Sequence, residues 1–395
     1  MKPAKSSRPS TSVVLGQPSW RLMSSSVEAW VAETGGHLGP VVFDRAGKRW
    51  RPYSVAPWAE EKPDRALPAL LRVLRGDFFC LPFGNNTSPY RNERHPPHGE
   101  TANQRWRLVS LAREGVRSTL HLRLATRTRP GQVDQQIALV DGHDAVYCRH
   151  VISGMKGPMN FGHHAMIKFP DAPGSGRIST SRFIHGQVFP DDFERPEQRG
   201  YSALQPGAEF RSIEQVPTRF GPPADLSVYP ARRGYEDLVM LVADPALALA
   251  WTAVTFPIQR YVWFAIRSPR LLRSTVFWIS NGGRHYPPWN GRHVSVMGLE
   301  DVTSYFHYGL AESVRRNPLS DRGYPTCLEL NPRQPLAIPY VMGVAGVPAG
   351  FDRVRDLHPL PTRDGILLES DSGKTACAAL DIPFLDEAPP APPQA

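Results

Sequence analysis

Cysteine is scarce in this chain of 395 residues, and its four copies, Cys80, Cys148, Cys327 and Cys377, stand far apart. No pair has the Cys-x-x-Cys spacing of a zinc or redox motif, and the pattern is not that of a disulfide framework. We therefore expect four buried free thiols in a reducing compartment.

Long apolar runs and long basic runs are also missing. The most apolar window, residues 238–256, is interrupted by Asp244 and Pro245, which argues against a membrane span. The apolar run at residues 13–15 is too short for a signal peptide. The formal net charge is +9, but Lys and Arg are dispersed, which argues against nucleic-acid binding and leaves a site for sugar phosphates open. We expect a soluble, cytoplasmic protein that binds neither membranes nor nucleic acids.

Proline and glycine are plentiful by contrast, with 41 and 32 residues. This usage predicts many turns and few long helices, while 41% hydrophobic and 10% aromatic residues suffice for an ordinary core. No repeat and no convincing linker divides the chain. We predict disordered tails at residues 1–18 and 387–395 around a single all-β domain at residues 19–386, a mainly antiparallel sandwich with short helical inserts.

Apolar residues place the expected strands, and they alternate with other residues at 27–32 and 120–124. The strands are predicted at residues 27–32, 38–43, 120–124, 133–140, 146–152, 238–243, 248–256, 261–266, 274–280, 326–330, 336–344 and 365–368. Short helices are predicted within residues 63–74 and 304–315, and a helix over 246–253 is the alternative to a strand there. Residues 75–106 read as a long loop, and residues 171–236 have no clear period. His121 and His150 are expected on the solvent faces of their strands.

The first polar island, residues 95–106, places His98 beside Gly99 and continues with Asn103, Arg105 and Trp106. Glycine lets a ligand or backbone approach closely. Amide, guanidinium and indole groups suit a sugar, whose hydroxyls need hydrogen bonds and whose C–H faces pack on rings. An ordinary proline-rich loop with exposed polar residues is the alternative.

Two further islands interrupt strand-like sequence: His163 and His164, and Glu300 with Asp301. Histidine can donate a proton near neutral pH, and a partly buried glutamate can accept one. These residues could form an acid and a base on opposite sides of a substrate. Either His164 or Glu300 alone could equally be structural.

A Gly/Pro-rich loop precedes Glu300 by little more than ten residues and carries Asn281, Arg284 and Trp289. Polar and aromatic groups in such a loop can line a pocket. A structural turn around a buried tryptophan explains the same residues equally well.

Metal binding is the competing chemistry. Two sets could hold zinc or manganese in a cupin-like barrel: His95 and His98 with Glu100, and His163 and His164 with His285 and His293. Adjacent histidines point to opposite faces of a strand, however, and rarely share an ion. We predict no metal and no other cofactor.

The order and spacing of the three islands resemble the galactose mutarotase (aldose 1-epimerase) superfamily, including its hexose-6-phosphate epimerase branch. Arg-Gly, then Cys-x-Pro-x-Gly, precedes His-Gly-x-x-x-Asn-x-x-Trp at residues 98–106; His164 and Gly298-Leu299-Glu300 follow in the family's order. The resemblance implies a β-supersandwich over about residues 20–385 and ring opening at an anomeric carbon. It also implies Glu300 as general base, His164 as general acid on the ring oxygen, and His98 as the group that orients the sugar.

The resemblance further implies that Arg75 contacts a substrate hydroxyl or phosphate and that Trp106 forms an aromatic wall. The chain departs from the family pattern at Met166 and Ile167, where Tyr-Phe is usual, and at Ala102, where Arg is usual and Arg105 is a displaced substitute. These departures leave open which sugar is bound and whether it carries a phosphate.

Three hypotheses remain at this stage. A cofactor-independent sugar 1-epimerase is favoured. The alternatives are a non-catalytic carbohydrate-binding protein on the same fold and a metal-dependent cupin-like enzyme. In the favoured account the partner is a small-molecule carbohydrate, and the oligomeric state is not determined.

Overall fold

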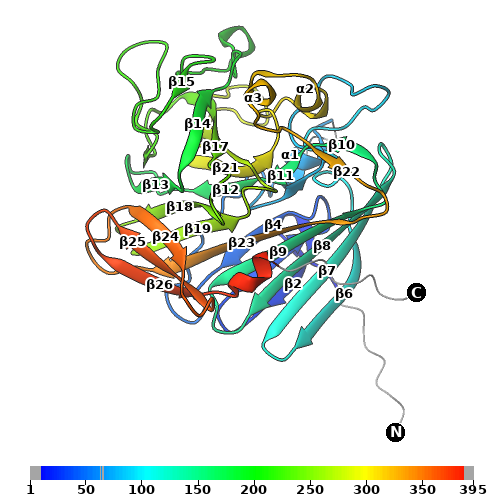
Figure 1. Cartoon of the computed structure of the whole chain (residues 1–395), viewed down its shortest axis with the longest axis vertical. Helices are drawn as coiled ribbons and strands as arrows, with labels where there is room; N and C mark the ends of the chain where they lie inside the picture. Colours follow the sequence, from blue (N-terminus) through cyan, green and yellow to red (C-terminus); the bar gives the residue numbers. More distant parts are fainter. Residues whose placement is uncertain (1–9, 63, 65, 387–395) are drawn as a thin grey trace.

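The computed structural model describes residues 10–62, 64 and 66–386, which are built mainly of antiparallel β-strands (Figure 1). The predicted all-β class is confirmed, because antiparallel ladders form the sheets and the helices are short. The predicted tails fall largely outside the described residues, except that residues 10–18 are ordered. Ser12–Val14 form strand β1, which pairs with the next strand, so the predicted N-terminal tail is too long.

An eight-stranded sheet runs in the order β15-β14-β17-β20-β21-β11-β5, and β12 also pairs with β21. Its strands are β5 (Phe79–Cys80), β11 (Phe161–His163), β12 (Ala165–Lys168), β14 (Phe183–Val188), β15 (Glu209–Phe210), β17 (Tyr235–Ala243), β20 (Ser274–Asn281) and β21 (Val296–Thr303). In the register of β20 and β21, Val276 lies opposite Glu300 and Trp278 lies opposite Gly298.

A nine-stranded sheet runs in the order β16-β13-β18-β19-β23-β9-β8-β7-β6. Its strands are β6 (Arg107–Glu114), β7 (Arg117–Thr126), β8 (Gly131–Val140), β9 (Ala145–Ser153), β13 (Gly176–Thr180), β16 (Val228–Tyr229), β18 (Ala250–Phe256), β19 (Tyr261–Arg267) and β23 (Leu336–Gly346). Strand β18 settles the alternative at residues 246–253 in favour of a strand.

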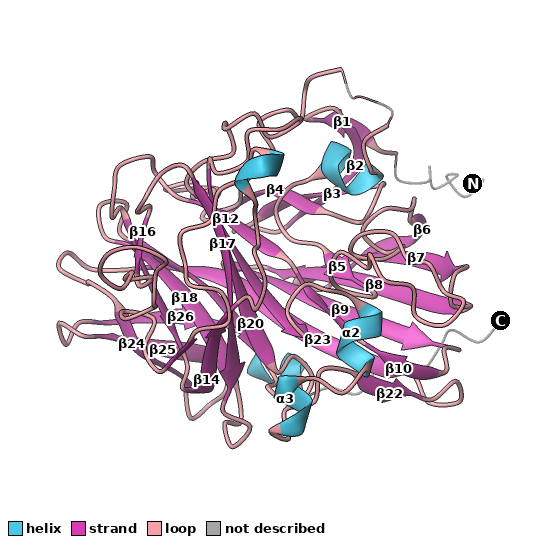
Figure 2. Cartoon of the chain, turned by 90° about the horizontal axis from the view of Figure 1, so that it is seen from above, coloured by secondary structure: helices cyan, strands magenta, loops and turns pink. Residues whose placement is uncertain are grey.

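Three smaller sheets complete the molecule, and short helices lie outside the sheets (Figure 2). The small sheets consist of β1 with β2 (Gln17–Met23), β3 (Glu28–Ala32) and β4 (Leu38–Val42); β10 (Gly157–Met159) with β22 (Leu328–Leu330); and β24 (Val354–Pro359), β25 (Gly365–Ser370) and β26 (Thr375–Ala379). The helices are α1 (Ala69–Val73), α2 (Leu310–Val314), α3 (Pro318–Asp321), η1 (Pro196–Gln198) and η2 (Ile382–Leu385).

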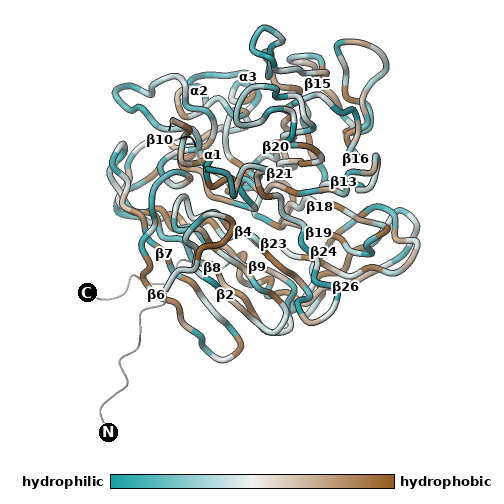
Figure 3. The backbone as a smooth tube through the Cα atoms, turned by 180° about the vertical axis from the view of Figure 1, so that it is seen from behind, coloured by the Kyte–Doolittle hydropathy of each residue, from teal (hydrophilic) through white to brown (hydrophobic). Residues whose placement is uncertain are grey.

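Side-chain alternation divides the eight-stranded sheet into two faces. In β17, β20 and β21 the odd-numbered apolar residues, such as Phe277 and Leu299, join the large core shared with the nine-stranded sheet. The even-numbered ones, such as Met240 and Val302, join a second cluster beneath the loops. Hydrophobic segments follow the strands in the middle of the molecule, and hydrophilic ones follow many surrounding loops (Figure 3). We call the face with the odd-numbered residues the core face and the face with the even-numbered residues the pocket face.

Several local predictions need correction. Only residues 310–314 of the predicted helix at 304–315 are helical, because Phe306 (φ 46°) and Gly309 (φ 134°) adopt conformations that interrupt a helix. His150 is buried and stacks on Phe79 with ring centroids 4.0 Å apart, so it does not face solvent. Cys377 is exposed, contrary to the expectation that all four thiols are buried.

In the part of the chain that the structure describes, no helix is long and apolar enough to cross a membrane.

Candidate active site

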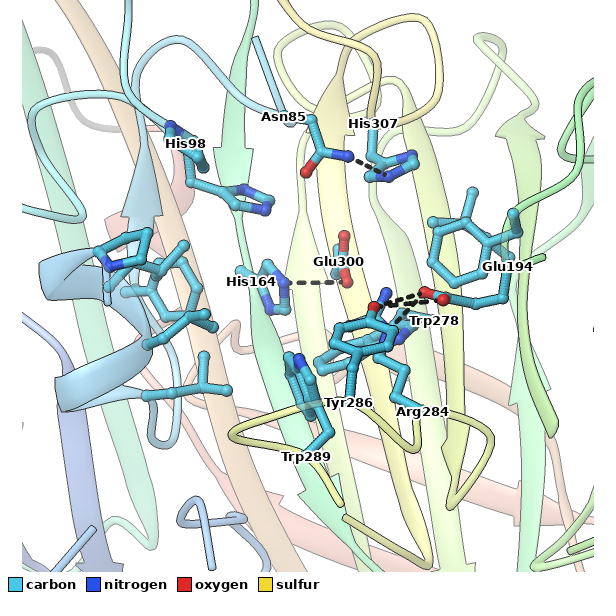
Figure 4. Close-up of a pocket in the computed structure, with 18 of the residues that line it drawn as sticks. Asn85, His98, His164, Glu194, Trp278, Arg284, Tyr286, Trp289, Glu300 and His307 are labelled. Carbon is cyan, nitrogen blue, oxygen red and sulfur yellow. Dashed lines mark hydrogen bonds and ion pairs between the residues drawn. The ribbon is translucent and has the colours of Figure 1, made fainter. Parts of the chain in front are cut away.

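A cavity of about 400 Å³ opens on the pocket face of the eight-stranded sheet (Figure 4). Its floor comes from even-numbered residues of three adjacent strands, Leu238, Trp278 and Glu300. Helix α1 forms one side, and the loops around Glu194 and Arg284 form the other. The strand period of two therefore places side chains from distant parts of the sequence side by side.

Glu300 lies in the middle of β21, and its carboxylate has room because Gly298 precedes it by one strand repeat. A Cβ on Gly298 would lie 2.6 Å from Glu300 Oε1 and 3.1 Å from Trp278 Cβ. Any larger residue there would displace the carboxylate or the indole.

His164 stands between β11 and β12, where it faces the pocket while its neighbour His163 faces the core. Its Nε2 lies 3.2 Å from Glu300 Oε1. Phe78 stacks on the His164 ring at 4.5 Å, and Phe78 O accepts the backbone N–H of His164 at 2.9 Å. These contacts fix the imidazole beside the carboxylate.

Burial shifts the pKa of both groups toward their neutral forms. Burial raises the pKa of Glu300 well above its usual range, and the Arg284 charge opposes that shift only in part. Burial, with help from His98, lowers the pKa of His164 well below its usual value. When the pair holds one proton, its net charge is zero whether the proton is on Glu300 or on His164. A pair without net charge suits a site withdrawn from water. It presents one proton donor and one acceptor at the same place.

His98 is held above this pair by a left-handed turn. His98 (φ 57°) and Gly99 (φ 77°) are consecutive residues at positive φ, and a Cβ on Gly99 would lie 1.9 Å from Leu81 O. The His-Gly pair therefore reflects a backbone requirement.

The ring of His98 acts as a neutral hydrogen-bonding group. Its Nδ1 lies 3.3 Å from Cys80 Sγ and accepts the backbone N–H of Gly84 at 3.5 Å. Because Nδ1 is an acceptor there, Nε2 carries the proton. Burial lowers the pKa of His98 to about 3, so the ring is a neutral donor at physiological pH.

The upper rim adds Asn85 and His307, whose Nδ2 and Nε2 atoms are 2.9 Å apart. Burial, together with His98, lowers the pKa of His307 to about 3. The rim therefore supplies neutral donors and acceptors.

The polar side of the pocket is centred on Arg284, whose Nε donates to Glu194 Oε1 at 2.6 Å. Tyr286 OH lies 3.2 Å from both oxygens of Glu194, and the Arg284 guanidinium lies over the Trp289 ring at 4.6 Å. Burial alone would lower the Arg284 pKa, but Glu194 and Glu236 outweigh it and raise the pKa above its usual value. Arg284 is thus a cation that pairs with Glu194 through Nε.

Five of the ten predicted site residues line this cavity: His98, His164, Arg284, Trp289 and Glu300. These residues are far apart in the sequence. The sheet brings together the three islands and the Gly/Pro-rich loop that precedes Glu300.

The other five predicted residues do not line it. Arg75 is buried and ties the N-terminal hairpin to the domain by donating to Val14 O and Leu15 O at 2.9 and 2.8 Å. Asn103 Nδ2 donates to Pro97 O and Gly99 O at 2.7 and 2.8 Å and so holds the loop that carries His98.

Trp106 is buried in the core, and its indole N–H donates to Thr101 O at 2.9 Å. Arg105 forms an exposed ion pair with Glu33. Asn281 donates to Ala231 O at 2.9 Å. The sequence predicts that these five residues contact substrate. In the structure four of them donate to backbone carbonyls, and Arg105 forms a surface ion pair.

Sequence reasoning missed Asn85, Glu194, Tyr286 and His307, which also line the cavity. Glu194 lies within residues 171–236, where no period was visible. His307 lies four residues after Thr303, the end of strand β21, in an aromatic-rich turn, and Asn85 follows Gly84. Strand ends and glycine turns next to a predicted site residue were the available signals.

The histidine sets of the cupin-like alternative do not converge. Among residues 10–62, 64 and 66–386, no group of three or more His, Cys, Asp or Glu side chains has the arrangement of a metal site. His293 instead lies 2.6 Å from Ser280 Oγ through Nδ1 and stacks on Trp278.

Comparison with solved structures shows the fold. A provisionally assigned aldose 1-epimerase from Escherichia coli K12 matches over 84% of this chain and 100% of its own, with a TM-score of 0.56 and 14% identity. A galactose mutarotase-like protein from Clostridium acetobutylicum matches over 85% and 98%, with a TM-score of 0.56 and 10% identity. A galactose mutarotase related enzyme from Lactobacillus acidophilus matches over 82% and 97%, with a TM-score of 0.53 and 10% identity.

These likenesses confirm the predicted galactose mutarotase-like sandwich as the fold of this chain. No protein-family model matches the chain, and no curated protein matches its sequence.

Proposed function

We propose that this protein is an aldose 1-epimerase-like isomerase, which interconverts the α and β anomers of an aldose by acid and base catalysis. The observation that carries the proposal is the buried Glu300–His164 pair at the base of the cavity, with 3.2 Å between Oε1 and Nε2. The fold shared with mutarotase-like structures supports it, and the neutral donor His98 above the pair supplies a hydrogen bond to the sugar.

Ring opening then needs one proton to leave the anomeric hydroxyl and one to reach the ring oxygen. Glu300 takes the first as general base, and protonated His164 gives the second as general acid, while the bond from C1 to the ring oxygen breaks and the aldehyde forms. After rotation about the C1–C2 bond, the same steps in reverse close the ring to the other anomer. Each assisted transfer is worth about 100- to 10,000-fold in rate.

The pair holds one proton throughout this sequence. Ring opening starts from the arrangement with the proton on His164, which burial disfavours, and ends with the proton on Glu300, the arrangement that both pKa shifts favour. The reaction therefore needs no cofactor, because side chains make both transfers. A buried site favours such an exchange, since neither arrangement of the pair has a net charge.

NMR saturation transfer between α and β anomer signals tests the proposal. Wild type should accelerate exchange of at least one aldose in a panel, and Glu300→Gln should abolish the acceleration while remaining folded by circular dichroism. Acceleration that persists in Glu300→Gln would contradict the role of the pair.

A carbohydrate-binding protein without turnover is the second candidate. Met166 and Ile167, which stand where the resemblance expects Tyr-Phe, are buried apolar residues and add no polar group to the site. Ligand line broadening without acceleration of any sugar, in wild type and Glu300→Gln alike, would select this candidate.

A further inference from the structure

The two sides of the cavity differ in what they offer a ligand. The side at Arg284 and Glu194 carries charged and polar groups, whereas the side at α1 is built from leucine and proline. In Figure 4 the labelled polar residues Arg284 and Glu194 lie across the His164–Glu300 pair from this helix.

The α1 side presents almost no hydrogen-bonding groups, because its backbone is already bonded. Leu70 N donates to Asn103 Oδ1 at 3.0 Å, and Leu71 O accepts from Trp58 Nε1 at 2.7 Å. The carbonyls of residues 72–74 accept from Gln17, Arg75 and Ala56. A substrate group placed against this wall meets side-chain carbon.

The proposed chemistry says which part of a sugar lies there. If His164 protonates the ring oxygen, then the carbon on the far side of that oxygen, C5, sits next to His164. Phe78 stacks on His164 and lines the cavity together with Leu70 and Leu74. The substituent on C5 therefore points toward the apolar wall.

The charged residues that line the cavity argue against a phosphate group in that substituent. Among the described residues that line the cavity, Arg284 is the only lysine or arginine, and its Nε is paired with Glu194. It also lies on the opposite side from α1. A phosphate on C6 would bring about two negative charges to the α1 side of a cavity whose one cation, Arg284, lies on the opposite side and is paired with Glu194.

We infer that the preferred substrate is an uncharged aldose with an apolar substituent on C5, in the simplest case a 6-deoxyhexose whose methyl group packs on the α1 wall. This inference rests on the proposed function. A C6 hydroxyl buried against this wall would lose its hydrogen bonds to water, which lowers kcat/KM by about 10- to 100-fold relative to the methyl compound.

Matched sugars that differ only at C6 test the inference. Saturation transfer would compare 6-deoxy-D-glucose, D-glucose and D-glucose 6-phosphate, and also 6-deoxy-D-galactose with D-galactose, each corrected for its rate without protein. We expect the 6-deoxy sugar of each pair to exchange about 10- to 100-fold faster and the phosphate not to be accelerated. Equal or faster exchange of the hydroxyl or phosphate sugars would overturn the inference and leave the proposed function standing.

If the protein accelerates the exchange of no sugar, ligand-observed NMR binding of the same compounds separates the substrate preference from the epimerase function. Preferential binding of the 6-deoxy sugars would retain the inference and reject the epimerase function, and equal binding or none would overturn the inference too.

A substitution in the wall provides the structural control. Leu71 is half-buried and lines the cavity, so Leu71→Asn supplies an amide to a C6 hydroxyl and should shrink the preference for the 6-deoxy sugar at least about fivefold. Leu67 lies four residues earlier and lines a separate surface depression, so Leu67→Asn should leave the preference unchanged. An unchanged preference in Leu71→Asn would contradict the placement of C5.

Discussion

On the two faces of the eight-stranded sheet, consecutive residues carry the same kinds of ionisable side chain. His163 and Asp301 point to the core face, and His164 and Glu300 point to the pocket face. Asp301 lies 2.8 Å from each of Arg267 Nη1, Thr275 Oγ1 and Tyr340 OH, and His163 Nδ1 lies 2.8 Å from Asp77 Oδ2.

The pocket-face pair has far fewer partners. Within the described residues, the Glu300 side chain makes no hydrogen bond or ion pair apart from its contact with His164. Each of the two histidines leaves one buried ring nitrogen without a hydrogen bond, Nδ1 in His164 and Nε2 in His163, so the contrast lies in the carboxylates. A buried charge that the protein satisfies fully stabilises structure, whereas one left partly unsatisfied beside a cavity is available to a ligand. In the proposed function, the contrast separates side chains that hold the sheet from side chains that are available to a substrate.

Glu300→Gln should give the largest effect on the pocket face. The amide cannot accept the anomeric proton, so the anomer-exchange rate should fall about 100- to 10,000-fold. Chemical denaturation should show that the free energy of unfolding is unchanged or increased, because a buried ionisable group has been replaced by a neutral one. A large loss of stability with little loss of rate would assign Glu300 to structure.

Asp301→Asn should show the reverse pattern on the core face. It leaves the buried Arg267 guanidinium without its carboxylate, which costs about 3–5 kcal/mol in the free energy of unfolding. Urea denaturation measures this loss, and exchange assayed at a temperature where the variant is folded should stay within a few-fold of wild type. An unchanged stability would break the comparison.

Gly298→Ala sharpens the comparison without removing an ionisable group. The added Cβ would meet Glu300 Oε1 at 2.6 Å and must displace it, and a displacement of this size should lower the rate about 10- to 100-fold. Gly221 does not line the cavity, and an added Cβ there meets nothing within 4 Å, so Gly221→Ala should leave the rate unchanged. Full activity in Gly298→Ala would show that the position of the carboxylate is not critical.

Glu236 extends the comparison to pH. Burial raises its pKa from 4.5 to about 7, against the opposing charge of Arg284, so the folded chain keeps a proton that the unfolded chain loses between these values. The contribution of Glu236 to the free energy of unfolding is therefore complete below about pH 4.5. It falls as the pH rises to about 7, by up to about 1.4 kcal/mol per pH unit for one proton. Glu236→Gln should flatten this slope in urea denaturation at pH 5, 6, 7 and 8. An unchanged slope would contradict the assigned shift.

His98→Gln should have the smallest effect. Because His98 is a neutral donor through Nε2, a glutamine amide can replace its hydrogen bond, and kcat should fall by less than about tenfold. His98→Leu removes the donor, so kcat should fall further in this variant, as measured by the same saturation-transfer assay. Equal losses in the two variants would indicate that His98 transfers a proton.

The sequence predicted the class of fold because alternation is a local signal. Strand Arg117–Thr126 alternates buried and more exposed residues, whereas Ser274–Asn281 and Leu336–Gly346 are apolar runs that are mostly buried on both faces. The helix at residues 304–315 was overestimated because positive φ at Phe306 depends on tertiary packing. Residues 171–236 were unreadable because their strands are short and separated by long loops.

The candidate site was predictable only in part. The three islands marked His98, His164 and Glu300, but a motif does not show which way a side chain points. Arg75 and Trp106 have residue types that suit a sugar, yet their polar groups are used by backbone carbonyls inside the protein. Glu194 and His307 reach the cavity through loop paths that no local pattern encodes.

The adjacent residues His163 and His164 provide the most direct test of the proposed mechanism, because His163 points to the core face and His164 to the pocket face. The anomer-exchange rate would be measured for His164→Gln and His163→Gln at a temperature where both are folded, with the favoured sugar of the panel. We predict that His164→Gln loses about 100-fold or more while His163→Gln stays within a few-fold of wild type. Comparable rates in the two variants, or a greater loss in His163→Gln, would contradict the assignment of proton transfer to the pocket face.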